Sequence, residues 1–315
     1  MRFLSIFILI SLVFVTSAAN ALLCDPSQEL CGFVHGHRTS GSPAKPSSSN
    51  AIHINPANVP TDKMIGIEGI YYKGEVDVSL ARGLGRVGAA ISPSNSEETF
   101  FGPPGLEPDS DLLDRKINKN KYPSQKITLA TAVSLIDTSG SGFSKFSLSL
   151  GVMGKYHKFD STTTGGGGVT GVWGPFSFGY SRYADKYHLS LKDYGQPDTY
   201  VTTDFDVESM SAGIYLGSVA VDYSLLELYM PNDRWEVKLV TASIFIKRGI
   251  FTVSVRNEDS ARPSYSYTLN TLSTVRTKSE TFLGAQLTAG SHLMIGAFYN
   301  YYLLREMSLS ATLFF

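Results

Sequence analysis

The sequence predicts an all-β fold, a transmembrane antiparallel β-barrel of about 14 strands with a polar segment before it. From Met64 onward, apolar and polar residues alternate with a period of two. Many alternating segments are long enough to cross a bilayer at a tilt of about 45°. Tyrosines gather near segment ends, where an aromatic girdle would lie. A soluble β-sandwich also alternates, but it uses shorter strands and must bury its apolar faces in pairs.

Residues 1–21 read as a cleavable signal peptide. Arg2 precedes an apolar stretch from Phe3 to Val15, and the small residues Ala19-Asn20-Ala21 then form an A-x-A cleavage site. The stretch is short for a membrane-spanning helix, which needs about 20 apolar residues, although an uncleaved anchor is the alternative.

Residues 22–62 are rich in Ser, Pro, Asn and Gly and show no sustained period, so we expect a periplasmic tail or a plug inside the barrel. Cys24 and Cys31 are expected to form a disulfide in an exported chain, which would stiffen such a plug. With His35 and His37 nearby, a metal site is the alternative, but the spacing matches no structural zinc pattern. We therefore expect no metal and no cofactor.

The barrel is expected over residues 63–315. The expected strands are 64–72, 75–82, 84–92, 127–137, 143–157, 169–182, 186–192, 205–216, 218–230, 235–246, 249–257, 279–290, 292–302 and 306–315. Twelve strands is the alternative, because some of these segments are short.

If successive strands cross the membrane in opposite directions, the long connections all lie at the outer end, where bacterial barrels carry them. The expected outer connections are 93–126, 158–168, 193–204 and 258–278, and the expected inner turns are 138–142, 183–185 and 247–248. This arrangement requires residues 264–272, which also alternate, to form an outer hairpin and not a spanning strand. Gly165–Gly168 would then be a flexible outer loop, since no phosphate-binding Lys-Ser or Lys-Thr follows.

The segment "MSLSATLFF" places Leu309 and Leu313 on one face and Ser310 and Thr312 on the other. It resembles the C-terminal strand of Gram-negative outer-membrane barrels, which ends in Phe and is read by the barrel-assembly machinery. The resemblance implies that Phe315 is the assembly signal. It also implies an outer-membrane location, with outer-membrane lipid and the assembly machinery as partners.

A narrower resemblance is carried by Asn55-Pro56-Ala57 in "AIHINPANVP". This tripeptide is similar to the Asn-Pro-Ala element of the long-chain fatty-acid transporter family, whose members have fourteen strands and an N-terminal hatch in the lumen. The resemblance implies that Asn55, Pro56 and Ala57 gate passage. The tripeptide is also good turn chemistry in its own right.

The outer connection 94–116 holds apolar residues together with a stiff Gly-Pro-Pro-Gly turn. These residues are Phe100, Phe101, Leu106, Leu112 and Leu113. They would either pack on the barrel rim or form the capture site for a hydrophobic small molecule.

Charges expected in the lumen are Glu75, Asp77, Asp222, Glu236 and Lys238. His188 and Ser190 share strand parity, with Asp193 nearby, and are similar to the His and Ser of outer-membrane lipid hydrolases. They are more simply ordinary lumen residues, so we do not expect an enzyme. The formal net charge of -1 gives no electrostatic case for nucleic acid.

The function expected from these features is passive uptake of small hydrophobic molecules across the outer membrane. A structural or partner-binding barrel, a general porin and a lipid hydrolase are the alternatives.

Overall fold

The computed structural model describes the N-terminal residues 52–72 and most of the barrel. The described ranges are 52–72, 75–94, 126–138, 144–158, 160–191, 199–230, 233–246, 248–258, 261–266, 271–276, 280–289, 292–300 and 307–315. Within these ranges, no helix is long and apolar enough to cross a membrane.

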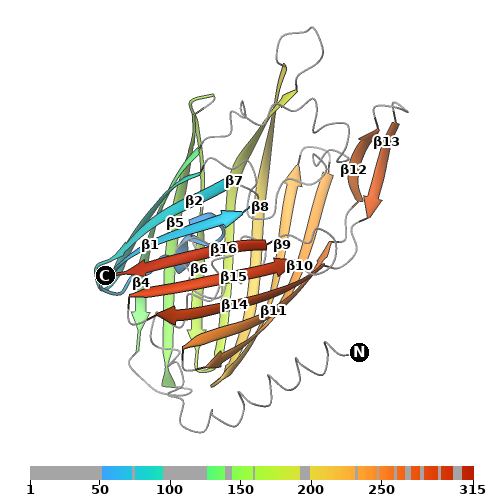
Figure 1. Ribbon diagram of the computed structural model, residues 1–315. Coiled ribbons are helices and arrows are strands. Elements are labelled where there is room, and N and C mark those ends of the chain that lie inside the picture. The colour runs from blue at the N-terminus through green and yellow to red at the C-terminus, as the bar shows by residue number, and fades with distance from the viewer. Residues whose placement is uncertain are drawn as a thin grey trace, which may run out of the picture.

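Fourteen antiparallel strands form a closed barrel, in which each strand pairs with its neighbours around the ring (Figure 1). The first eight are β1 (Met64–Tyr72), β2 (Glu75–Gly83), β3 (Val87–Ser94), β4 (Lys126–Asp137), β5 (Phe146–His157), β6 (Thr162–Trp173), β7 (Phe176–Leu191) and β8 (Thr199–Leu216). The remaining six are β9 (Val219–Met230), β10 (Asp233–Ile246), β11 (Gly249–Glu258), β14 (Glu280–Ala289), β15 (Leu293–Asn300) and β16 (Met307–Phe314). The expected count of fourteen strands is confirmed.

The outer face of the barrel is apolar and the inner face is largely polar. On β16, Leu309 and Leu313 are 42% and 41% exposed, whereas Ser310 and Thr312 are buried inside, as the sequence predicted. The same alternation is present on β11, where Phe251 and Val253 are exposed and their neighbours in the strand are buried. Because a closed barrel leaves no unpaired edge, this apolar belt can lie in hydrocarbon, and the fold is that of an outer-membrane β-barrel.

The barrel closes between the first and the last strand. Ile65 and Phe315 exchange two backbone hydrogen bonds, with N–O distances of 3.0 and 2.9 Å. The pairing continues from Gly66 opposite Phe314 to Tyr72 opposite Ser308. Phe315 is therefore part of the seam that closes the barrel.

The two ends of the barrel differ in their connections. The short turns 84–86, 174–175 and 217–218 lie at the end where β1 begins and β16 stops, which is the periplasmic end by the usual pattern of bacterial barrels. The opposite end carries the long connections 95–125 and 259–279.

The second of these long connections holds a separate two-stranded sheet of β12 (Ala261–Ser266) and β13 (Thr271–Arg276), which stands beside the barrel in Figure 1. The expected outer hairpin at residues 264–272 is confirmed.

The strand boundaries at residues 158–192 differ from the expected ones. Gly165–Gly168 lie inside β6 and are not an outer loop, and residues 183–185 lie in the middle of β7 and are not an inner turn. The true turn is Gly174-Pro175, where Gly174 has a φ of 55°. Glycine adopts this left-handed conformation without steric cost, and proline ends the preceding strand.

Two of the expected lumen charges point the other way. Glu236 and Lys238 share the outward parity of Val240 on β10, and their side chains form an ion pair at 2.7 Å. The alternation was misread because Leu239 faces inward and is only 1% exposed. Asp222 does face the lumen, at 1% exposure. The side chains of Glu75 and Asp77 lie outside the described residues.

Candidate functional site: the lumen segment and the wall beside it

Residues 52–60 lie inside the barrel, against the inner faces of β4, β5 and β6. Their centre is a short 3-10 turn, η2 (Pro56–Asn58), with Asn55 as its N-cap. The Asn55 side-chain oxygen accepts a hydrogen bond from the Ala57 backbone N–H at 3.0 Å. Proline at the first position suits such a turn, because its φ is fixed and it needs no N–H partner there.

The same asparagine ties the turn to the barrel wall. Asn55 Nδ2 donates to the Val169 carbonyl and to Thr170 Oγ1 on β6, both at 3.2 Å. Thr170 Oγ1 in turn donates to Asn58 Oδ1 at 2.5 Å. On β7, Ser181 Oγ donates to the Ile54 carbonyl at 2.6 Å. These bonds satisfy polar groups of a buried segment, which would otherwise cost free energy.

Wall glycines make room for this segment. A Cβ on Gly151 of β5 would lie 2.2 Å from the Pro56 carbonyl carbon, and one on Gly168 of β6 would lie 2.2 Å from Asn55 Oδ1. Gly83 and Gly88 face the backbone oxygens of Asp62 and Pro60 in the same way. The inner wall thus has glycine at four positions where the segment approaches most closely.

Apolar side chains gather beside the turn in the lumen. The cluster joins Ile52 and Ile54 to apolar residues on the barrel wall. Its members on the wall include Ala130, Met153, Tyr183, Phe205, Val207 and Leu226. This group, here called the lumen apolar cluster, lies along β4, β5 and β7–β9.

Hydroxyl groups line part of the lumen from β8 to β11. Ser209 and Ser211 of β8 and Ser224 of β9 face inward and are buried. Thr241 and Ser254 share a hydrogen bond of 3.0 Å across β10 and β11, and Ser243 and Thr252 share one of 3.3 Å. These inward hydroxyl groups lie among buried apolar side chains such as Leu239, Phe245 and Phe282.

The barrel wall is incomplete between β6 and β7. Their pairing ends at Gly166 opposite Tyr183, although both strands continue toward the outer end. Beyond that point, residues 162–165 of β6 pair only with β5, and residues 184–191 of β7 pair only with β8. The glycine run of β6 lies at this divergence, where a backbone without side chains bends most easily.

A buried ionic cluster bridges the divergence from the inside. Asp185 of β7 contacts Lys155 Nζ of β5 at 2.5 Å, Lys126 Nζ of β4 at 3.1 Å and His157 Nε2 of β5 at 3.7 Å. Lys155 also stacks 4.1 Å from the centre of the Tyr183 ring, and His157 shares a hydrogen bond of 2.9 Å with Thr164 of β6. Asp185 thereby links β7 to β4 and β5 across the end of the β6–β7 ladder.

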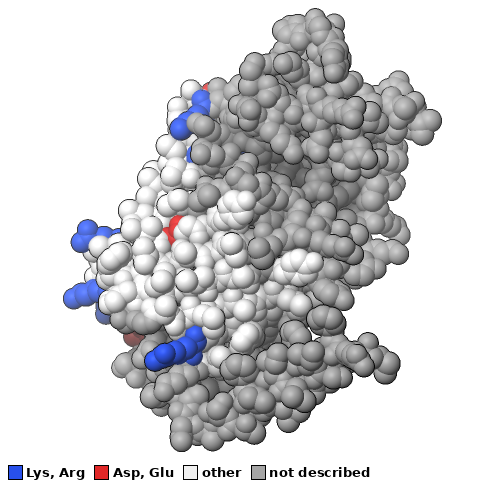
Figure 2. All heavy atoms as spheres, viewed as in Figure 1, with Lys and Arg blue, Asp and Glu red and all other residues white. Residues whose placement is uncertain are grey.

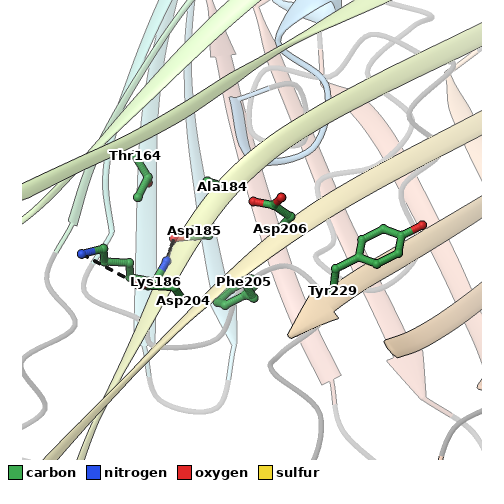
Figure 3. Close-up of a pocket in the computed structure, with 8 residues that line it drawn as sticks. All are labelled: Thr164, Ala184, Asp185, Lys186, Asp204, Phe205, Asp206 and Tyr229. Atoms are coloured by element: carbon green, nitrogen blue, oxygen red, sulfur yellow. Dashed lines mark hydrogen bonds and ion pairs between the residues drawn. The ribbon is translucent and has the colours of Figure 1, made fainter. Parts of the chain in front are cut away.

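One ion pair also bridges the divergence from the outside, where Lys186 Nζ of β7 contacts Asp160 of the β5–β6 turn at 3.2 Å. Two further pairs join β7 to β8: Lys186 Nζ contacts Asp204 at 3.7 Å, and Arg182 contacts Asp206 at 3.3 Å. An open hollow of about 460 Å³ lies here, shown in Figure 3. Its lining is Thr164, Ala184, Asp185, Lys186, Asp204, Phe205, Asp206 and Tyr229. Since Asp185 and Phe205 face the lumen and Lys186 and Asp204 face outward, the hollow reaches both faces of the wall.

The site residues expected from the sequence fall into two groups. Asn55, Pro56 and Ala57 lie buried in the lumen, and Phe315 lies in the seam. Cys24, Cys31 and the loop residues Phe100, Phe101, Leu106, Leu112 and Leu113 lie outside the described residues, as do the side chains of His188 and Ser190. Within the described part of the chain, no group of His, Cys, Asp and Glu is arranged to hold a metal ion.

The ionic cluster around Asp185 was not predicted. Asp185 had been assigned to an inner turn, so its side chain could not be placed on either face. A signal was present, because Gly174-Pro175 is strong turn chemistry and no Gly or Pro interrupts residues 180–191 after the alternation of Phe176, Phe178 and Tyr180. A single strand from Phe176 to Leu191 puts Tyr183 and Asp185 on the inward parity.

No family model and no curated protein matches the chain. Among solved structures, the chain is similar to a FadL homologue of Pseudomonas aeruginosa, at 13% identity and a TM-score of 0.46, over 92% of this chain and 99% of that one. It is also similar to the toluene transporter TodX of Pseudomonas putida, at 10% identity and a TM-score of 0.44, over 90% and 96% of the two chains.

A further similarity is to OmpT of Vibrio cholerae, at 10% identity and a TM-score of 0.37, over 80% of this chain and 96% of that one.

Proposed function

We propose that this protein is an outer-membrane transport barrel that takes up small hydrophobic molecules, with Asn55, Pro56 and Ala57 as its hatch. The observation that carries the proposal is the fit of residues 54–60 to the inner wall through Asn55, Thr170 and the wall glycines. A segment that simply trailed into the periplasm would need no such fit. The lumen apolar cluster beside it offers the surface that an apolar solute requires.

The hatch can be tested by steric displacement. Valine at Gly151 or Gly168 would place atoms where the segment lies, so either variant should lose the closed state. Gly69→Val is the matched control, because a Cβ at Gly69 meets nothing within 4 Å. Conductance in planar bilayers should rise for both inner-wall variants and for a chain lacking residues 22–62, and should stay at the wild-type level for Gly69→Val. If the Gly151 and Gly168 variants fold normally and their conductance stays at the wild-type level, the hatch proposal is wrong.

The path of the solute can be tested at the lumen apolar cluster. Phe205 is 4% exposed and joins this cluster to the hollow beside β7, which makes it the expected contact for an apolar ligand. Phe205→Ser should weaken the binding of a fluorescent fatty acid. Phe178→Ser removes an aromatic ring from the lipid-facing surface, where Phe178 is 44% exposed, and should leave binding unchanged.

The outer loop 94–116 is the proposed capture site. If Phe100 and Phe101 receive the ligand before it reaches the lumen, replacing both with Ser should weaken binding of the same probe while the barrel keeps its heat-modifiability. Unchanged binding would assign these residues to rim packing. A wild-type barrel that binds no apolar probe would favour the structural or partner-binding alternative.

A further inference from the structure

We propose that the hollow at the barrel seam binds a glycerophospholipid with an anionic headgroup from the periplasmic leaflet of the outer membrane. The hollow has a volume of about 310 Å³ and lies at the periplasmic end of β1, β2 and β16. Its lining is Lys63, Met64, Ile65, Arg82, Gly83, Leu84 and Phe315. It shares no lining residue with the hollow between β6 and β7.

Strand pairing explains why an apolar floor and a cationic edge meet here. Arg82 of β2 stands opposite Ile65 of β1, and Ile65 is hydrogen-bonded to Phe315. The three side chains therefore lie side by side on the outward face. Two exposed side chains complete an apolar surface beside the Arg82 guanidinium. They are Leu84 in the turn after β2, at 61% exposure, and Phe315, at 69% exposure.

The charges at this edge favour an anion. Among the ion pairs that join described residues, none includes Lys63 or Arg82. This edge carries three cations, Lys63, Arg82 and Arg86, against two carboxylates, those of Asp62 and of the Phe315 backbone. Figure 2 shows basic side chains projecting from the edge of the molecule near the C-terminal end marked in Figure 1. Lys63 keeps its stem along the turn, with Cε 3.7 Å from the position of a Cβ on Gly85.

The hollow continues into the lipid-facing belt. Ile67 pairs with Leu80 on one side and with Leu313 on the other, and the three side chains are 38%, 43% and 41% exposed. They lie directly above the hollow on the same outward face. A phosphate held between Lys63 and Arg82 would thus leave an acyl chain free to run over Ile65 and Ile67 toward the bilayer centre. Cationic side chains at a membrane boundary suit a lipid phosphate, and the apolar surface beside them suits its acyl chain.

Native mass spectrometry of the full barrel in detergent tests the proposal, with phosphatidylglycerol and phosphatidylethanolamine titrated separately. Wild-type protein should retain phosphatidylglycerol preferentially. Lys63→Gln with Arg82→Gln should weaken that retention roughly tenfold, since each cation near an anionic lipid contributes modestly. Lys63→Gln alone should show part of the loss, and because Lys63 precedes β1 it leaves strand pairing intact. Leu84→Ser should weaken retention of both lipids.

Arg248→Gln is the matched control, because Arg248 is an exposed cation of the inner turn between β10 and β11 and does not line the hollow. Its lipid retention should equal that of wild type. Equal retention of the two lipids by wild type would overturn the proposal, as would the same loss in Arg248→Gln as in the double variant. Displacement of the lipid by inorganic phosphate alone, at concentrations near that of the lipid, would show that the apolar floor takes no part and would also overturn it.

Discussion

Asp185 is the carboxylate on which the buried cations of the lumen depend. Its side chain and those of Lys126 and Lys155 are 0%, 6% and 3% exposed. Asp185→Asn would leave both ammonium groups buried without a counter-charge. We expect this variant to lower the free energy of unfolding by about 3–5 kcal/mol, the usual cost of breaking a buried pair from one side. Urea titration followed by loss of heat-modifiability measures the change.

Asp206→Asn is the control for that variant. Asp206 pairs with Arg182 on the outward side of the same strands, but the two side chains are 45% and 59% exposed. Solvent screens such a pair, so its loss should change the free energy of unfolding by less than about 1 kcal/mol. Similar losses in the two variants would contradict the distinction between a buried cluster and a screened surface pair.

Asp160 in the outer turn between β5 and β6 should titrate at an unusually low pH. Partial burial raises the pKa of its carboxyl, but hydrogen bonds from Thr162 and Lys186 outweigh that effect and lower the pKa from 3.8 to about 2. The carboxylate's contribution to stability is therefore present above pH 3.8 and is lost as the pH falls through about 2.

An NMR titration of the Asp160 side-chain carboxyl measures this pKa. The midpoint should lie near 2 in the wild type and should move upward in Lys186→Met, which removes one of the hydrogen bonds. A midpoint near 3.8 in the wild type would show that the turn does not hold the carboxylate as described.

The orientation of a single strand was predictable where apolar residues marked one face and polar residues the other. β16 alternates without interruption, and its orientation could be read directly from Leu309, Ser310 and Thr312. The boundaries and orientation of β6 and β7 could not be read in this way. Four consecutive glycines carry no side-chain pattern and therefore looked like a loop. With the glycine run read as a loop, the sequence predicted an inner turn at 183–185, whereas the turn lies at Gly174-Pro175.

The candidate site was only partly predictable for a related reason. The turn chemistry of Asn55-Pro56-Ala57 is local, so the sequence shows it. The wall glycines and the cluster around Asp185 are defined by contacts between residues far apart in sequence, such as Lys126 and Asp185. Those contacts depend on the register of several strands at once, and a shift of one residue moves a side chain to the opposite face.

Depth in the membrane should decide the cost of a charge on the outer face. Val152 lies in the middle of β5 and is 61% exposed, while Leu216 ends β8 at the periplasmic boundary and is 62% exposed. Val152→Arg should cost about 2–4 kcal/mol, whereas Leu216→Arg should cost about 0–1 kcal/mol. Folding titrations into lipid vesicles compare the two. Because the exposures match, equal costs would argue against the described position of the apolar belt.

The barrel as a whole depends on Phe315 for closure. Deleting Phe315 removes both of its hydrogen bonds to Ile65 and the outward ring beside them. The level of heat-modifiable barrel in the outer membrane should fall. Phe315→Tyr keeps the backbone bonds and the ring and serves as the control. Normal levels after the deletion would show that neither assembly nor closure needs this residue.

The hydrogen bonds between Ile65 and Phe315 also bear on folding kinetics. They join the beginning of the first strand to the end of the chain, so the most non-local pairing in the barrel is also the one that closes it. Every shorter intermediate, whatever the number of strands already paired, has two open edges with unpaired N–H and C=O groups. High contact order makes such folding slow. The ring therefore closes only when β1 pairs with β16, and until then these two strands keep their hydrogen-bonding groups open.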